Sequence, residues 1–77
     1  MEINVLLFGQ LTDITKAGTI ALDNVTDTDA VVKKLHRQFP ALANSKYVIA
    51  VDKKIISSNT QLTNNCTVAL MPPFSGG

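Results

Sequence analysis

One segment of this 77-residue chain has the hydrophobic spacing of a helix, and the other apolar segments have the spacing of strands. In TDTDAVVKKLHRQFP (residues 26–40) the apolar residues recur at helical intervals, as Val31 or Val32, Leu35 and Phe39. Thr26 or Asp27 can cap the start of this helix, and Pro40 follows its end. We therefore expect one main helix, which can cover only one face of a sheet.

The remaining apolar segments are rich in residues that suit a pleated surface. They are EINVLLFG (2–9), TIALDN (19–24), KYVIAVD (46–52), KII (54–56) and TVALM (67–71). The first two should pair antiparallel, and the connection between them, residues 10–18, has room for one helical turn. The order of elements predicts an α+β fold, with a mixed sheet of four to five strands and one main helix across one face.

The first and last predicted strands carry apolar residues on both of their faces. In the first strand Ile3, Val5 and Leu7 alternate with Leu6 and Phe8; in the last strand Val68 and Leu70 alternate with Ala69 and Met71. If the helix covers the first set, then Leu6, Phe8 and Met71 face solvent. An apolar patch of this kind commonly marks a partner interface, although loops that fold over it are the alternative.

Composition excludes several classes of function. A net charge of +1 lacks the electrostatic footprint that nucleic acid requires. The apolar run at residues 3–8 is too short for a signal peptide or a membrane span, so we expect a cytoplasmic protein without a membrane partner. Cys66 is the single cysteine and His36 the single histidine, which argues against a disulfide and a metal site. We expect Cys66 to be a half-buried structural residue.

The sequence VALMPPFSGG ends in a segment unlike the domain before it. Pro72 and Pro73 cannot donate hydrogen bonds to a ladder, so we expect a folded domain over residues 1–71 and a flexible tail over 72–77. The prolines favour an extended direction, and Gly76 and Gly77 lack a Cβ and can pass a narrow channel. Such a tail is suited to entering the active site of another protein.

A carboxylate at Gly77 would be ionised at neutral pH and a poor acceptor for nucleophiles, so it needs activation. Reaction with ATP would give an acyl-adenylate, and a sulfur nucleophile could then convert this to a thiocarboxylate. The 77 residues contain no phosphate-cradling loop, so another protein should bind the ATP and this chain should bind no cofactor. The chain is then the carried substrate and is not catalytic alone.

These features together resemble a known family. The strand and helix order with a C-terminal diglycine resembles the β-grasp, ubiquitin-like sulfur carriers. The ending VALMPPFSGG, the opening LLFGQL and the central segments RQFP and VIAVD are similar to the small subunit of molybdopterin synthase. The likeness runs the length of the chain. It departs at Cys66, where the family more often has an acidic turn.

The resemblance implies a role for several residues. Gly77 would carry the acyl-adenylate and then the thiocarboxylate, and Gly76 would give access to it. The partner-binding residues would be Phe8, Ile55, Met71, Pro72, Pro73, Phe74 and Ser75. The implied partners are the large subunit of molybdopterin synthase, in a two-plus-two heterotetramer, an adenylating enzyme that uses ATP, and a sulfur donor protein. The sulfur would go to the cyclic pterin precursor of the molybdenum cofactor.

Three alternatives remain open. Another β-grasp sulfur carrier, for thiazole or thiolated tRNA, would use the same activated tail. A ubiquitin-like modifier would instead join Gly77 to lysines of target proteins through an isopeptide bond. A non-covalent β-grasp adaptor is also possible, but it leaves the tail unexplained.

Overall fold

The computed structural model describes residues 2–73. Five strands form one mixed sheet in the order β2-β1-β5-β3-β4. The central pair, β1 and β5, is parallel, and the other three pairs are antiparallel. Along the chain the elements are β1 (Glu2–Leu7), α1 (Leu11–Thr15), β2 (Thr19–Asp23), α2 (Thr28–Gln38), the 3-10 helix η1 (Pro40–Asn44), β3 (Val48–Val51), β4 (Lys54–Ile56) and β5 (Thr67–Met71). The predicted α+β fold is confirmed.

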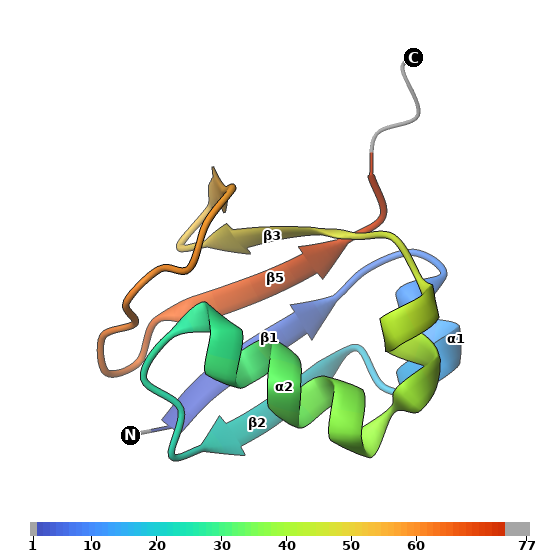
Figure 1. Ribbon diagram of the computed structural model, residues 1–77, viewed down its shortest axis with the longest axis horizontal. Helices are drawn as coiled ribbons and strands as arrows, with labels where there is room; N and C mark the ends of the chain where they lie inside the picture. The colour runs from blue at the N-terminus through green and yellow to red at the C-terminus, as the bar shows by residue number, and fades with distance from the viewer. Residues whose placement is uncertain (1, 74–77) are drawn as a thin grey trace.

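The main helix, α2, lies across one face of the sheet (Figure 1). Asp27 caps its start, because the Asp27 side chain accepts a hydrogen bond of 2.9 Å from the backbone N–H of Ala30. Val31 and Leu35 are buried, at the helical spacing that the sequence predicts. The helix therefore places its apolar stripe on the sheet and leaves its basic side chains outside.

The core lies between α2 and the sheet. Its buried residues come from both the sheet and α2 and include Ile3, Val5, Leu7, Leu22, Val31, Leu35, Val68 and Leu70. The strand residues in this set are the alternate residues whose side chains face the helix. Burial of this set is the main stabilising contribution of the fold, at roughly 25 cal/mol for each Å² of apolar surface removed from water.

Two local features differ from the sequence prediction. Pro40 was expected to mark only the end of the helix, but it also begins η1, in which Leu42 is fully buried. Proline is well suited to the first position of a helix, because its missing N–H would be unpaired there anyway. In addition, β1 ends at Leu7, so Phe8 and Gly9 lie just beyond the strand.

Cys66 was predicted to be half-buried, and this prediction is wrong. Its side chain is 4% exposed and belongs to the core. The residue before it, Asn65, has a φ of 68°, and this turn brings the chain inward to start β5. The thiol therefore fills core volume at the entry to β5.

The polar loop between β4 and β5 is tied to the start of α2. Asn59 Oδ1 accepts a hydrogen bond of 2.9 Å from the N–H of Asp29, and Thr28 and Thr60 exchange bonds of 2.9 and 3.0 Å. Leu62 from this loop reaches the core.

Within residues 2–73, no helix has the length and hydrophobicity to cross a membrane. The same residues bring no three His, Cys, Asp or Glu side chains together as a metal site.

Candidate functional site

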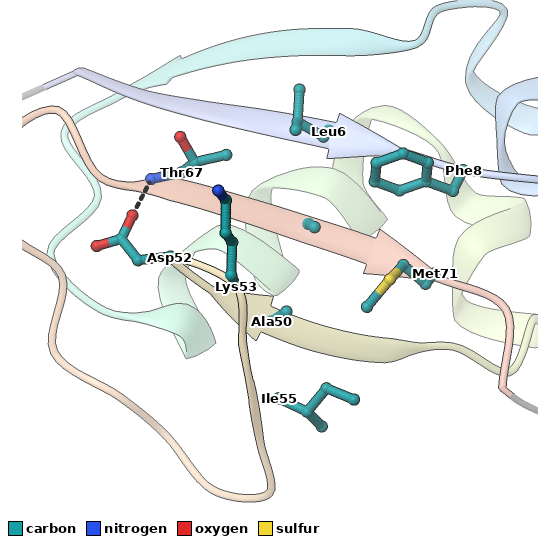
Figure 2. Close-up of a pocket in the computed structure, with 9 residues that line it drawn as sticks. Leu6, Phe8, Ala50, Asp52, Lys53, Ile55, Thr67 and Met71 are labelled. Carbon is teal, nitrogen blue, oxygen red and sulfur yellow. Dashed lines mark hydrogen bonds between the residues drawn. The ribbon is translucent and has the colours of Figure 1, made fainter.

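The face of the sheet opposite α2, which we call the open face, carries an apolar groove of about 630 Å³. Figure 2 shows the side chains around it. The groove is lined by Leu6, Phe8, Ala50, Asp52, Lys53, Ile55, Thr67, Ala69 and Met71. Phe8 and Ile55 are its most exposed large apolar residues, with 45% and 59% of their surfaces accessible.

The strand register explains the shape of the groove. Leu6 on β1 pairs with Ala69 on β5, Ala69 pairs with Ala50 on β3, and Ala50 pairs with Ile55 on β4. Residues paired in this way lie on the same face of a sheet. Across the four strands the side chains are therefore large, small, small and large. The two alanines form the floor of the groove, and Leu6 and Ile55 form its walls.

One rim of the groove is polar. Asp52 and Lys53, with φ values of 47° and 74°, form the two-residue turn between β3 and β4. Asp52 Oδ1 accepts a hydrogen bond of 2.9 Å from the N–H of Thr67, which ties the turn to the start of β5. The Lys53 side chain lies over the open face, as Figure 2 shows. Lys54 follows the turn and begins β4, so the strand predicted at residues 54–56 is confirmed.

The tail begins at the other end of the groove. β5 ends at Met71, Pro72 is half-buried and Pro73 is exposed. The N–H of Phe8 donates a 3.1 Å hydrogen bond to Leu70, so Phe8 lies beside the end of β5. The predicted site residues Phe8, Ile55 and Met71 all line the groove, and Phe8 and Met71 lie at the end from which Pro72 continues. The other predicted site residues, Phe74, Ser75, Gly76 and Gly77, lie outside the described residues.

A second hollow of about 240 Å³ lies on the helix side, beside Tyr47. The Tyr47 hydroxyl and His36 Nε2 are 2.7 Å apart and join the segment before β3 to α2. Burial raises the pKa of Tyr47 above its usual value, because the phenolate form loses hydration. No local pattern indicates this pair, because it depends on how the segment before β3 packs against α2. This side of the molecule is held together by internal contacts, whereas the open face offers its side chains outward.

Sequence reasoning found the apolar anchors of the groove and missed its floor and rim. The alternation in β5 identified Met71 as an outward residue, and the same alternation places Ala69 there. No local signal showed that Ala50 would lie beside it, because that depends on the pairing of β3 with β5. The chemistry that the assembled groove offers is apolar contact with a charged edge, which is the chemistry of a binding surface.

The sheet order, with a single main helix packed on one face, defines a β-grasp protein of the ubiquitin-like class. Solved structures of this class superpose over nearly the whole chain. The small archaeal modifier protein 1 from Methanosarcina acetivorans has a TM-score of 0.83 at 22% identity, covering 99% of this chain and 96% of its own. Its counterpart from Haloferax volcanii gives 0.82 at 19% identity, covering 100% of both chains.

A third similar structure is a complex of subunits 1 and 2 of the molybdopterin-converting factor from Helicobacter pylori. Its matching chain has a TM-score of 0.75 at 22% identity, and the match covers 100% of both chains. At these identities the likeness shows a shared fold. The family itself is shown by a match to the ThiS family over residues 5–77, so the chain belongs to the ThiS family.

Proposed function

We propose that this chain is a sulfur carrier for molybdopterin biosynthesis, in which Gly77 is adenylated, converted to a thiocarboxylate and used to donate sulfur to the cyclic pterin precursor. The observation that carries the proposal is that Met71, the last residue of β5, lines the apolar groove and is followed at once by Pro72, where the tail begins. A partner that covers the groove would also receive the tail. Membership of the ThiS family and the residues PPFSGG support the same reading.

The groove supports a protein partner with an apolar projection. Phe8 and Ile55 stand on either side of a floor made by Ala50 and Ala69, so an inserted side chain would contact both walls. Large exposed anchors of this kind commonly dominate binding energy. We propose the large subunit of molybdopterin synthase as this partner. The Helicobacter pylori complex of subunits 1 and 2 supports the choice, because its matching chain has the same fold.

The proposed chemistry begins with activation of the Gly77 carboxylate. A carboxylate oxygen of Gly77 attacks the α-phosphate of ATP on an activating enzyme, and pyrophosphate leaves. Hydrosulfide supplied by a sulfur donor protein then attacks the acyl carbon and AMP leaves, which gives a thiocarboxylate and a proton. In the large subunit the thiocarboxylate sulfur bonds to a carbon of the pterin precursor and displaces an oxygen substituent from that carbon. Water then cleaves the acyl–sulfur bond, which regenerates the Gly77 carboxylate and leaves the sulfur on the precursor as a thiolate. Two carriers, one for each sulfur, would complete the dithiolene in a two-plus-two heterotetramer.

Deletion of Gly77 tests this proposal. We expect the shortened chain to keep the unfolding curve of the full chain and to lose sulfur transfer in a mixture with the large subunit, the activating enzyme, ATP, the sulfur donor protein and the pterin precursor. The full-length chain in the same mixture is the control. Equal molybdopterin formation by the shortened chain would contradict the proposal.

A ubiquitin-like modifier is the second candidate, and the structural likeness to small archaeal modifier protein 1 favours it. The activated tail would then form an isopeptide bond with a lysine amine, releasing AMP or a thiol. A ladder of larger covalent species that contain this chain would support the modifier. A thiazole or tRNA carrier would share the thiocarboxylate and differ only in the acceptor that takes the sulfur.

A further inference from the structure

Gly9 and Pro72 lie in contact at the point where the tail begins. Gly9 follows the end of β1 and has a φ of 59°, a conformation that favours glycine. A Cβ at this position would lie 2.8 Å from Pro72 Cγ and 3.3 Å from Pro72 Cδ. The space that a side chain at position 9 would fill is therefore taken by the proline ring.

The backbone around Gly9 is held from both sides. The N–H of Phe8 donates a 3.1 Å hydrogen bond to Leu70 on β5. The Gly9 carbonyl accepts two bonds from Thr12, one of 3.1 Å from the N–H and one of 2.8 Å from Oγ1. Pro72, by contrast, follows the last residue of β5. If the two positions were forced apart, Pro72 would therefore move more readily than Gly9.

We propose that Gly9 is a positioning residue, which leaves room for the Pro72 ring and thereby sets the direction in which residues 73–77 leave the sheet. The inference rests on the proposed function, because the direction matters when Gly77 must enter the active site of another protein. Nothing in the sequence pattern marks Gly9 for this role, since it reads simply as the end of a strand.

A short displacement at Pro72 changes the direction of the peptide that follows β5. Opening the contact from 2.8 Å to a normal carbon separation of about 3.5 Å moves the ring by about 0.7 Å. Pivoted on Met71, about 3.8 Å away, this is a turn of about 10° in the direction of Pro73. Misplacement on this scale strongly reduces the rate of a reaction that depends on alignment.

Gly9→Asn is the most informative substitution. Asparagine tolerates a positive φ better than other residues with a Cβ, so this variant separates the clash with Pro72 from backbone strain. Gly18→Asn controls for the added side chain, because nothing lies within 4 Å of a Cβ at Gly18. Pro72→Ala removes the ring and tests the same contact from the other side.

The kinetic readout is adenylation of the chain by its activating enzyme. We expect Gly9→Asn to lower kcat/KM about ten-fold, chiefly through kcat, and Gly18→Asn to leave it within about two-fold. In the Pro72→Ala background, Gly9→Asn should change kcat/KM by no more than about two-fold. A ten-fold loss in both backgrounds would overturn the proposal, because Gly9 would then act without the ring.

A structural readout separates this inference from the proposed function. Residual dipolar couplings of the Cα–Hα bonds of Pro72 and Pro73 report their orientation relative to the sheet in the free chain. These couplings should change in Gly9→Asn and stay constant in Gly18→Asn; unchanged couplings in both would overturn the positioning role. If the wild-type chain is never adenylated, the proposed function fails, and the couplings still decide whether Gly9 directs Pro72.

Discussion

The two faces of the sheet are built from the same strands and from similar residue types, yet they have different surroundings. On the face under α2, Ile3, Val5 and Leu70 are all fully buried. On the open face, Phe8 and Ile55 keep about half of their surface in contact with water. The difference comes from the single main helix, which covers one face only (Figure 1). Apolar alternation in a strand therefore indicates two potential interfaces, and the number of helices decides which one is filled internally.

This contrast assigns different tasks to the two faces. The covered face supplies the apolar burial that stabilises the fold. The apolar residues of the open face remain available to stabilise a complex, because much of their surface is still hydrated in the free chain. Changes to the covered face should therefore alter the free energy of unfolding, and changes to the open face should alter affinity for a partner.

The largest expected effect is on stability, from Leu70→Ala. Leu70 is fully buried, so truncation leaves a cavity and should lower the free energy of unfolding by about 2–5 kcal/mol. Ile55→Ala removes a comparable side chain from the open face and should cost less than about 1 kcal/mol. Urea unfolding of both variants measures the contrast. Similar losses would show that the open face also carries the fold.

The next effect is on binding, from Phe8→Asp. A charge on the open face should weaken the complex with the large subunit about 100-fold or more, because a buried carboxylate there lacks a partner. The free energy of unfolding should change by less than about 1 kcal/mol, since Phe8 is 45% exposed. Titration calorimetry measures the affinity, and Asn44→Asp, an exposed site in η1, controls for the added charge. An unchanged affinity for Phe8→Asp would remove the open face from the interface.

The smallest effect concerns pH and the helix side of the sheet. The pKa of Tyr47 lies above its usual value of 10.0 because burial disfavours the phenolate. The unfolded chain therefore loses the Tyr47 proton at a lower pH than the folded chain. The contribution of Tyr47 to the free energy of unfolding is complete below pH 10 and declines as the pH rises further. Tyr47→Phe should be less stable at neutral pH by about 1 kcal/mol, through loss of the bond to His36.

The difference between wild type and Tyr47→Phe should then narrow above pH 10. Chemical unfolding of both proteins above and below pH 10 measures this difference in the free energy of unfolding. Taking the difference removes the effect of lysine titration, because both proteins have the same lysines. A constant difference at all pH values would mean that Tyr47 ionises equally easily in the folded and unfolded chains.

The sequence predicts those parts of the fold that depend on local pattern. The strand TVALM corresponds to β5, and the cap at Asp27 begins α2, because alternation and capping are local properties. The outward direction of Phe8 and Met71 follows from the same alternation. These residues are also the part of the candidate site that could be found without a structure.

The remaining features depend on contacts between distant segments. The alanine floor requires the pairing of β3 with β5, and the contact between Gly9 and Pro72 joins residues at opposite ends of the chain. The Nζ of Lys34 on α2 donates a hydrogen bond to the carbonyl of Asp23 at the end of β2. Such contacts are set by topology, which local periodicity does not encode.

The most direct test of the sulfur-carrier assignment is the intact mass of the untagged protein isolated from its own cells. The account predicts a fraction of the chain in which sulfur replaces one oxygen of the Gly77 carboxylate. That fraction should disappear when the activating enzyme is absent. A chain found only as the plain acid, with the remainder joined to lysines of other proteins, would contradict the sulfur-carrier function and identify the tail as a conjugation handle.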